Sequence, residues 1–295
     1  MTVKTVAVIA QGEMGSGTGG QLVHHGLRVI TNLTGRSSRS IGLAKDAGME
    51  DVGNDAALIN EADMFLSILP PVQAVALAKQ MAPHIEASNK SILYADCNAV
   101  APTTKEEIQA IVEPVGANFV DVGILGDPPD PIKNVTRYYA SGPYANDFSQ
   151  LKEYGLNIIH VGDTIGRAAA VKMCFANMTK TMVALAAETF AAAEALGVYD
   201  EVVHELSSSQ KNGFEWASKR VTLTPPKAYR WVGEVEEIGK TFEALGMPGE
   251  TCVGGAKMFQ IIADSPLGEE IVETRKRGTT LEDCSVVTAE YLAKK

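Results

Sequence analysis

The start of the chain combines a strand pattern, a glycine-rich turn and a helix pattern. Residues 3–10 are mostly Val, Ile and Ala, as is typical of a buried parallel strand. The turn Ala10-Gln-Gly-Glu-Met-Gly15 follows, then a helix pattern to about Gly26 and a second apolar run at 27–32. In this β–turn–α–β order the N-terminal N–H groups of a helix can bind a pyrophosphate, so we predict a dinucleotide site. The residues expected to form its turn are Gly12, Glu13, Met14 and Gly15.

Strand and helix patterns continue to alternate as far as residue 161. Further strands are expected at 50–52, 64–69, 91–96, 118–122 and 156–161, and helices at 40–47, 55–60, 72–82 and 103–112. This alternation predicts an α/β fold with a Rossmann-like, doubly wound and mostly parallel sheet. Ligands of such sheets bind beyond the carboxyl ends of the strands. We therefore expect the loops 69–72, 96–102 and 121–129 to line the site.

The end of the second strand indicates which dinucleotide binds. NAD-binding chains usually place Asp or Glu there for the ribose hydroxyls, but this chain has no acidic residue between Asn32 and Asp46. Two arginines among hydroxyl side chains suit the 2′-phosphate of NADP(H), through charge-assisted hydrogen bonds. The residues expected to bind this phosphate are Thr34, Arg36, Ser37 and Arg39. We expect NADP(H) as the cofactor, with a solvated basic loop as the alternative interpretation.

A long helix is predicted at about 166–198. The segment is rich in Ala, Leu and Met, contains no proline and reaches Gly197, a residue typical of helix ends. It is apolar nearly all round and should be buried in protein, while the charges that interrupt it argue against a membrane span. Lys172 is a charge early in this helix. It is either a catalytic amine in an interdomain cleft or a chain that extends to solvent.

The remaining sequence indicates a second, all-α domain. Helix patterns without strand patterns follow Gly197, among them those at 253–263, 269–276 and 281–294. We therefore expect residues 1–163 to form the dinucleotide-binding domain and residues 164–295 the helical domain. A net charge of −10 without a basic stripe argues against nucleic-acid binding. Four widely spaced cysteines without a CxxC pair predict neither disulfides nor a metal site. A strand pattern that begins at residue 3 leaves no room for a signal peptide, so a cytoplasmic location is expected.

Several motifs together resemble the β-hydroxyacid dehydrogenase family of the 6-phosphogluconate dehydrogenase-like superfamily. They are the Gly12–Gly15 turn, Arg36-Ser37, Leu69-Pro70-Pro71, the segment Asp96–Pro102 with Asn98, and Gly166 followed six residues later by Lys172. The resemblance covers the whole chain in order. The C-terminal segment 228–238 looks like a branch of this superfamily whose substrates are mostly unassigned.

The resemblance implies an NADP-dependent oxidoreductase that acts on a hydroxyl/carbonyl pair, with Lys172 as general acid and base. It places Leu69, Pro70, Pro71 and Asn98 at the cofactor. It places Asn98, Gly123, Leu125, Gly126 and Ala176 at the substrate, and the helical spacing from Lys172 adds Phe175 and Thr179. It also implies a homodimer formed through the C-terminal helical domain.

The substrate side departs from the family pattern. Leu125 replaces the serine that binds the substrate carboxylate, Asp127 replaces a glycine, and Ala176 replaces an asparagine one turn after the lysine. At about 100° per residue Thr179 shares the face of Lys172, whereas Asn177 is rotated roughly 140° away. These changes favour a more apolar or larger carbonyl substrate than a small hydroxy acid. An imine reductase and a non-catalytic NADP(H)-binding sensor are the alternative functions, and the retained lysine argues against both.

Overall fold

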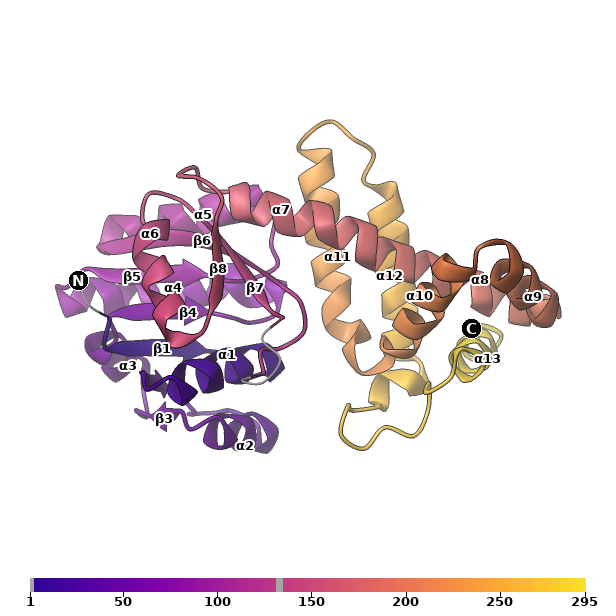
Figure 1. Cartoon of the computed structure of the whole chain (residues 1–295), viewed down its shortest axis with the longest axis horizontal. Coiled ribbons are helices and arrows are strands. Elements are labelled where there is room, and N and C mark those ends of the chain that lie inside the picture. The colour runs from indigo at the N-terminus through magenta and orange to yellow at the C-terminus, as the bar shows by residue number, and fades with distance from the viewer. Residues whose placement is uncertain (1–2, 131–134) are drawn as a thin grey trace. The chain divides into compact units, whose positions relative to one another are not determined.

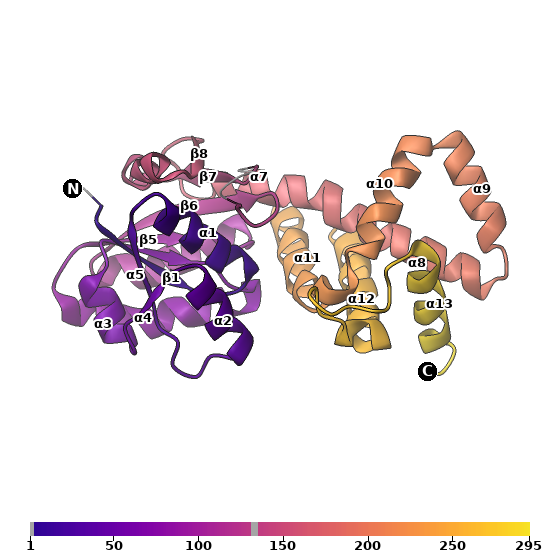
Figure 2. The ribbon, with the colours of Figure 1, turned by 60° about the horizontal axis from the view of Figure 1, so that its bottom comes forward.

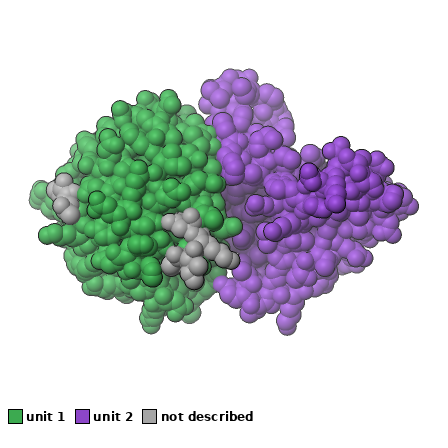
Figure 3. Space-filling model, in the orientation of Figure 1, with its two compact units in different colours: residues 1–173 green, residues 174–295 purple. Residues whose placement is uncertain are grey.

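A computed structural model describes residues 3–130 and 135–295. The chain divides into two compact units, Met1–Met173 and Cys174–Lys295, which Figure 3 shows in different colours. The boundary lies inside the long helix, ten residues after the position expected from the sequence. The expected division at residue 163 assigns the whole helix to the second domain, and it stays a prediction.

The N-terminal unit is built on one eight-stranded sheet, with the strand order β3-β2-β1-β4-β5-β6-β7-β8. The strands are β1 (Thr5–Ile9), β2 (Arg28–Thr31), β3 (Glu50–Asp51), β4 (Met64–Ser67), β5 (Ile92–Asp96), β6 (Ala117–Leu125), β7 (Arg137–Ser141) and β8 (Asn157–His160). All neighbouring pairs are parallel except β6 and β7. The predicted doubly wound, mostly parallel sheet is therefore confirmed.

Helices cover both faces of this sheet (Figures 1 and 2). On one face lie α1 (Glu13–His24), α2 (Ser38–Asp46) and α6 (Ala145–Phe148), whose apolar side chains join one core cluster. On the other face α3 (Asp55–Glu61), α4 (Ala74–Ser88) and α5 (Pro102–Val112) form a second core with Phe65, Tyr94 and Phe119. Short 3₁₀ turns occupy Pro71–Gln73, Glu113–Val115 and Ser149–Tyr154. Each face of the central strands is thus buried, which explains their continuous apolar sequences.

Two features near β6 differ from the prediction. Strand β6 continues to Leu125, so Gly123 and Leu125 lie in a strand and not in the loop where they were expected. Strand β7 was not predicted, and it pairs antiparallel with β6 over Asp121 to Leu125. The extra partner explains both differences, because its hydrogen bonds keep the backbone of β6 extended beyond residue 122.

The predicted long helix is confirmed, with an irregular turn in it. It consists of α7 (Arg167–Ala176), a π-helical turn η4 (Asn177–Thr181) and α8 (Met182–Ala195). The π turn was not predicted. Such turns often occur at functional sites and change the face on which the following residues lie.

The C-terminal unit contains only helices in its described part. After α8 come α9 (Tyr199–Ser209), α10 (Lys211–Thr222), α11 (Ala228–Glu243), α12 (Glu250–Asp264) and α13 (Leu281–Leu292), with 3₁₀ turns at Pro225–Lys227 and Pro266–Glu269. Helices α10, α12 and α13 pack on α8, and α11 packs on α12 (Figure 1). Throughout the described part of the chain, we find no helix with the length and apolar character needed to cross a membrane.

The helix predicted at 269–276 is wrong. Beyond the 3₁₀ turn the chain runs in turns, because its side chains bind nearby backbone groups. The backbone N–H of Lys276 donates to Glu270 Oε2 at 2.6 Å, and the Arg275 guanidinium donates to the carbonyl of Gly278. Such local bonds compete with the helical hydrogen-bond pattern.

Candidate functional site

The glycine turn after β1 has the geometry that a dinucleotide site needs. Gly12 caps the N-terminus of α1, and a Cβ at this position would meet no atom within 4 Å, so its backbone is open to a ligand. At Gly15 a Cβ would overlap the carbonyl oxygen of Ala10, so glycine is required where α1 crosses the end of β1. Further along α1, Gly17 and Gly19 allow the close approach of Pro129 and Met49. The residues present therefore fit a dinucleotide pyrophosphate at this helix N-terminus.

The predicted phosphate-binding residues gather at the end of β2. Ser37 caps α2, where its hydroxyl accepts a hydrogen bond from the N–H of Ser40 at 3.2 Å. The Thr34 hydroxyl donates to the carbonyl of Gly53 at 2.6 Å. Arg36 is half-buried, and its guanidinium forms no hydrogen bond or ion pair with any residue that the structure describes. Arg39 instead pairs with Glu13 at 3.2 Å and so links α2 to the first turn of α1.

Two carboxylates from outside β2 also reach this region, and sequence reasoning missed them. Asp51 Oδ1 accepts hydrogen bonds from the backbone N–H groups of Leu33 and Gly53, both at 3.0 Å. Asp55 accepts from the side chains of Asn32 and Gln80 at 2.7 and 2.6 Å. Both carboxylates therefore accept hydrogen bonds from neutral groups of the protein, whereas the Arg36 guanidinium forms none with the described residues.

Asn98 joins the loops that follow β4 and β5. Its Oδ1 accepts a hydrogen bond from the backbone N–H of Leu69 at 2.7 Å, and its Nδ2 donates to Ser67 Oγ at 2.8 Å and to Asp96 Oδ2 at 2.6 Å. Only 3% of Asn98 is exposed. Its polar atoms are thus bonded to the protein, and the predicted contact of this side chain with substrate and cofactor stays a prediction. Asn98 fixes the loop whose Leu69 and Pro70 are half-buried beside the dinucleotide turn.

A fully buried ion cluster underlies this edge of the sheet. The Lys105 ammonium donates to Asp96 Oδ1 at 2.6 Å and to the carbonyls of Asp96 and Val122 at 2.7 and 3.1 Å, and it lies 3.4 Å from Asp121 Oδ1. All three charged side chains have no exposed surface. Burial alone would lower the pKa of Lys105, but the charges of Asp96 and Asp121 outweigh it and the pKa is raised. The lysine is therefore a permanent cation between two carboxylates.

Asp121 also connects this cluster to helix α7. Its Oδ2 accepts hydrogen bonds from the N–H groups of Gly166 and Ala169, both at 3.0 Å, and from the Ser141 hydroxyl at 2.9 Å. The Ser141 oxygen in turn accepts from the N–H of Ala168 at 3.0 Å. Side chains of β6 and β7 therefore satisfy the first N–H groups of α7.

The structure places Lys172 at the carboxyl end of β6. Its ammonium donates to the carbonyl of Ile124 at 2.6 Å. A Cβ on Gly123 would lie 2.8 Å from the Ala168 carbonyl oxygen and 3.1 Å from Lys172 Cβ, so this glycine lets α7 pack against the strand. Since β6 runs parallel to β5, this end shares the sheet edge with the dinucleotide turn and the loop at Leu69. The amine therefore lies at the edge where such sheets bind ligands.

The other residues expected at the substrate have varied surroundings. Leu125 is only 3% exposed and belongs to the interior, whereas Gly126 is exposed with a positive φ of 116° beside the carbonyl of Val135. In the C-terminal unit, Phe175 is 46% exposed and Ala176 is buried. The Thr179 hydroxyl donates to carbonyls of its own helix at 3.2 and 3.3 Å. Leu125 thus packs in the interior, and its contact with substrate stays a prediction.

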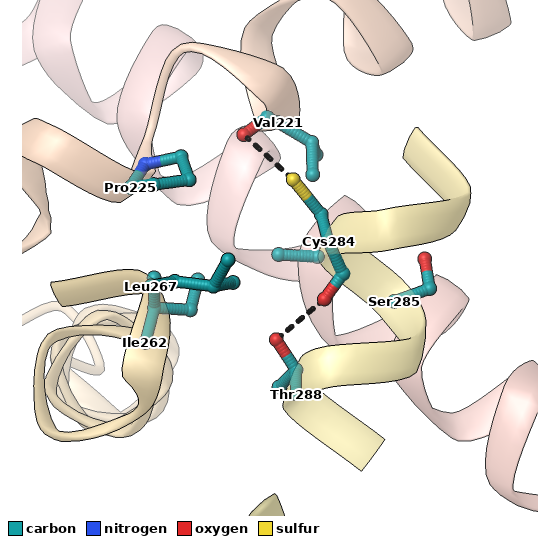
Figure 4. A pocket seen from close by; sticks show the side chains of 8 residues that line it. Val221, Pro225, Ile262, Leu267, Cys284, Ser285 and Thr288 are labelled. Atoms are coloured by element: carbon teal, nitrogen blue, oxygen red, sulfur yellow. Dashed lines mark hydrogen bonds between the residues drawn. The ribbon is translucent and has the colours of Figure 1, made fainter. Parts of the chain in front are cut away.

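The C-terminal unit holds two further features. A small pocket lies among α8, α10, α12 and α13, and Figure 4 shows Cys284 and Thr288 beside it. Its polar groups bind the backbone: Cys284 Sγ lies 3.9 Å from the Val221 carbonyl, and the Thr288 hydroxyl donates to the Cys284 carbonyl at 2.7 Å. Lys180 pairs with Glu234 at 2.5 Å and lies over the Trp231 ring at 4.4 Å. In the described part of the chain, no group of His, Cys, Asp and Glu side chains is arranged to hold a metal ion.

Known families and proteins match this chain over most of its length. The model for the NAD binding domain of 6-phosphogluconate dehydrogenase matches residues 5–154, and a domain of unknown function (DUF1932) matches residues 193–264. An uncharacterized 28.5 kDa protein in the 7S RNA 5′ region of Methanothermus fervidus is 29% identical over 236 residues, 80% of this chain and 89% of that protein.

Solved structures agree. A conserved protein of unknown function, described as structurally similar to 3-hydroxyacid dehydrogenases, aligns with a TM-score of 0.63 and 28% identity over 88% of this chain and 97% of that chain. Mycobacterium tuberculosis 3-hydroxyisobutyrate dehydrogenase, solved with L-serine, aligns with a TM-score of 0.67 and 18% identity over 98% and 99% of the two chains, which shows the fold alone. The match over residues 5–154 agrees with the sheet topology and the glycine turn. The chain therefore belongs to the family of the NAD-binding domain of 6-phosphogluconate dehydrogenase.

Proposed function

We propose that this chain is an NADP(H)-dependent oxidoreductase that transfers a hydride between the nicotinamide and a hydroxyl/carbonyl substrate such as a hydroxy acid. The observation that carries the proposal is the position of Lys172. Its amine lies against the last residues of β6, at the sheet edge shared with the dinucleotide turn. A proton donor there can serve the oxygen of a bound substrate.

The residues divide the task between them. The nicotinamide supplies or accepts the hydride when the cofactor is bound. Lys172 donates a proton to the substrate oxygen during reduction and accepts it during oxidation. The Ile124 carbonyl accepts a hydrogen bond from the amine and so holds it at the sheet edge. Gly12 and the N-terminus of α1 would bind the pyrophosphate, and the loop Leu69–Pro71 would lie beside the nicotinamide ribose.

The lysine is tested by paired substitutions. We expect Lys172→Ala to lower turnover by about 10²–10⁴-fold, the usual contribution of a general acid or base, with the affinity for NADPH nearly unchanged. Lys172→Arg keeps the charge but places a group that stays protonated, so it should be similarly slow. Near-normal turnover by either variant would contradict the assignment of Lys172 as general acid and base.

Arg36 supports the choice of NADP(H) over NAD(H). Its guanidinium has no partner among the described residues, and the carboxylates nearby are already hydrogen-bonded to the protein. We expect Arg36→Ala to weaken NADPH about 10-fold or more, as loss of a charge-assisted contact does, and to leave NADH unchanged. The control is Arg28→Ala, since Arg28 pairs with Glu50 and Glu61 instead. Equal affinity of the wild type for NADH and NADPH would contradict the proposal.

The substrate class is tested with a panel of hydroxy acids, keto acids, aldehydes and cyclic imines, followed by the absorbance of NADPH. Turnover of a hydroxyl or carbonyl compound supports the proposal. Turnover of imines alone identifies an imine reductase. Tight NADPH binding without any turnover favours a sensor.

A homodimer through the C-terminal helical domain is part of the proposal. The long helix exposes several large apolar side chains: Phe175, Met178, Met182, Leu185 and Leu196. Large exposed apolar surface often marks protein contacts, because its removal from water lowers the free energy. We expect Leu185→Lys to convert a dimer to a monomer in light scattering after size exclusion. Met247→Lys, at a methionine that is also about half exposed (51%), is the control. A wild-type monomer would contradict this part of the proposal.

A further inference from the structure

Helix α7 begins in an unusual way. The residue before it, Gly166, has no side chain with which to cap it. Caps normally come from this position and are local in sequence. Here the cap comes from the sheet, because Asp121 of β6 and Ser141 of β7 accept the N–H groups of Gly166, Ala168 and Ala169. The start of the helix is therefore fixed to two strands, in both rotation and height.

We propose that Asp121 and Ser141, held in place by Lys105, are positioning residues for the amine of Lys172. The inference rests on the proposed function of that lysine. Lys172 follows Gly166 by six residues, so a rotation or shift at the start of α7 is transmitted through the rigid helix to the amine. The buried Lys105 in turn fixes the carboxylate of Asp121.

Close packing strengthens this coupling. Strand β6 meets α7 at three residues. Asp121 caps the helix, Gly123 touches its backbone, and the carbonyl of Ile124 accepts the hydrogen bond of Lys172. An alanine Cβ at position 123 would already be too near the Ala168 carbonyl. Because packed interiors transmit small displacements, loss of the cap should move the amine instead of being absorbed locally.

The test compares Ser141→Ala with Ser149→Ala in the full chain. The Ser149 hydroxyl also donates one hydrogen bond, in this case to the backbone carbonyl of Ala145 at 3.0 Å, whereas that of Ser141 donates to the Asp121 carboxylate; no hydrogen bond of Ser149 reaches α7 in the described structure. The readout is the NMR signal of the ¹³C-labelled ε-carbon of Lys172, assigned by its disappearance in Lys172→Arg. This signal needs no substrate. In Ser141→Ala we expect the signal to broaden and its chemical shift to move toward that of the exposed lysines. In Ser149→Ala we expect no change.

Kinetics give the second readout. Ser141→Ala should lower kcat by about 10-fold, and Asp121→Ala by about 100-fold, while KM and the Kd for NADPH stay within about twofold, since misplacement of a catalytic group slows the chemical step. Asp121→Asn retains an acceptor for the helix N–H groups and should recover part of kcat. These variants are compared on whichever compound of the panel turns over.

The outcomes separate the two proposals. Faster hydrogen exchange at residues 164–171 in Ser141→Ala with an unchanged Lys172 signal would make the cap purely structural and overturn the inference. A loss of NADPH affinity as large as the loss of kcat would overturn it too, since the damage would then involve the nucleotide site. Full turnover by Lys172→Ala refutes the proposed function itself. A slow Lys172→Ala with an unchanged signal in Ser141→Ala refutes only the positioning role.

Discussion

Replacement of Lys105 by methionine would show how strongly the N-terminal unit depends on one buried cation. The ammonium makes three hydrogen bonds, one to the Asp96 carboxylate and two to the carbonyls of Asp96 and Val122. Methionine is also a long, unbranched and flexible side chain, so the substitution removes the charge and these bonds while it largely preserves packing. The variant thus isolates the electrostatic contribution.

The free energy of unfolding should fall by about 3–5 kcal/mol, the usual effect of removing one partner from a buried ion pair. Asp96 and Asp121 would be left without the cation between them, and neither has exposed surface through which water could compensate. The pKa of Lys105 is raised in the folded protein, so its contribution is fully present below the unfolded value of about 10.4 and is lost only above it. Measurements at neutral pH therefore report the whole effect.

Urea unfolding followed by circular dichroism measures this difference. Lys90→Met is the matched control, because the Lys90 ammonium donates to the carbonyls of Asn60 and Ala62 and forms no salt bridge with any carboxylate that the structure describes, although the charge of Asp63 acts on it from further away. Adding Asp121→Asn to Lys105→Met should restore part of the stability, because it removes one uncompensated charge. A loss of less than about 1 kcal/mol in Lys105→Met would refute this reasoning. So would a double variant whose loss of stability exceeds the sum of the losses in the two single variants.

Three other predictions follow from single residues. Gly15→Ala should weaken NADPH by about 10-fold or more in calorimetry, because its Cβ would overlap the Ala10 carbonyl. An alanine at Gly42, where a Cβ would meet no atom within 4 Å, should not weaken it. The hydrogen bond from Arg277 lowers the pKa of Asp283, so this pair stabilises the fold above about pH 3.9, and the stabilisation is lost as the pH falls below that value. Asp283→Asn should therefore lower the free energy of unfolding by at most about 1 kcal/mol near pH 7, and the difference from the wild type should vanish near pH 2. A thiol reagent at pH 8 should modify Cys174 first, because the other three thiols are buried and burial raises their pKa; equal labelling of all four would contradict this.

Local sequence patterns were sufficient for most of the fold and for the nucleotide edge. Short β-branched runs and helical periodicity involve only residues that are close in sequence. They were therefore enough to predict where the parallel strands and the helices between them lie. The spacing of Gly12 and Gly15 has an equally local cause, since one needs an open backbone and the other a close crossing of helix and strand. The residues between Thr34 and Arg39 follow β2 directly, so their place in the fold followed from that of the strand.

Glycine misled the prediction around β6. Gly123 stands in a sequence that resembles a glycine-rich loop, but its glycine is needed because α7 crosses the strand there. A missing side chain has the same sequence signature in a loop and under a closely packed helix. Strand β7, whose pairing keeps Gly123 and Leu125 extended, gave no strong pattern of its own. The error therefore arose from a contact between segments far apart in the chain.

The buried cluster was missed for a similar reason. Lys105 follows Thr104 and precedes two glutamates, a context typical of an exposed helix. One signal was available: Asp96 and Asp121 lie at or near the ends of the predicted strands 91–96 and 118–122, and in the structure they pair in register. Two carboxylates side by side in a buried sheet require a cation, because burial without one is strongly unfavourable. A search of the following helix for a lysine would have found Lys105.

The π turn limits how far a residue can be assigned to a face of the long helix by counting. The prediction for Thr179 assumed about 100° per residue, but Asn177–Thr181 forms hydrogen bonds from residue i to i+5, so each residue there turns less. Nothing in the composition of this turn distinguishes it from the α-helical residues around it. Lys172 lies before the turn, so its assignment does not depend on the count, whereas that of Thr179 does. The sequence therefore supports the catalytic lysine more firmly than any substrate contact beyond residue 176.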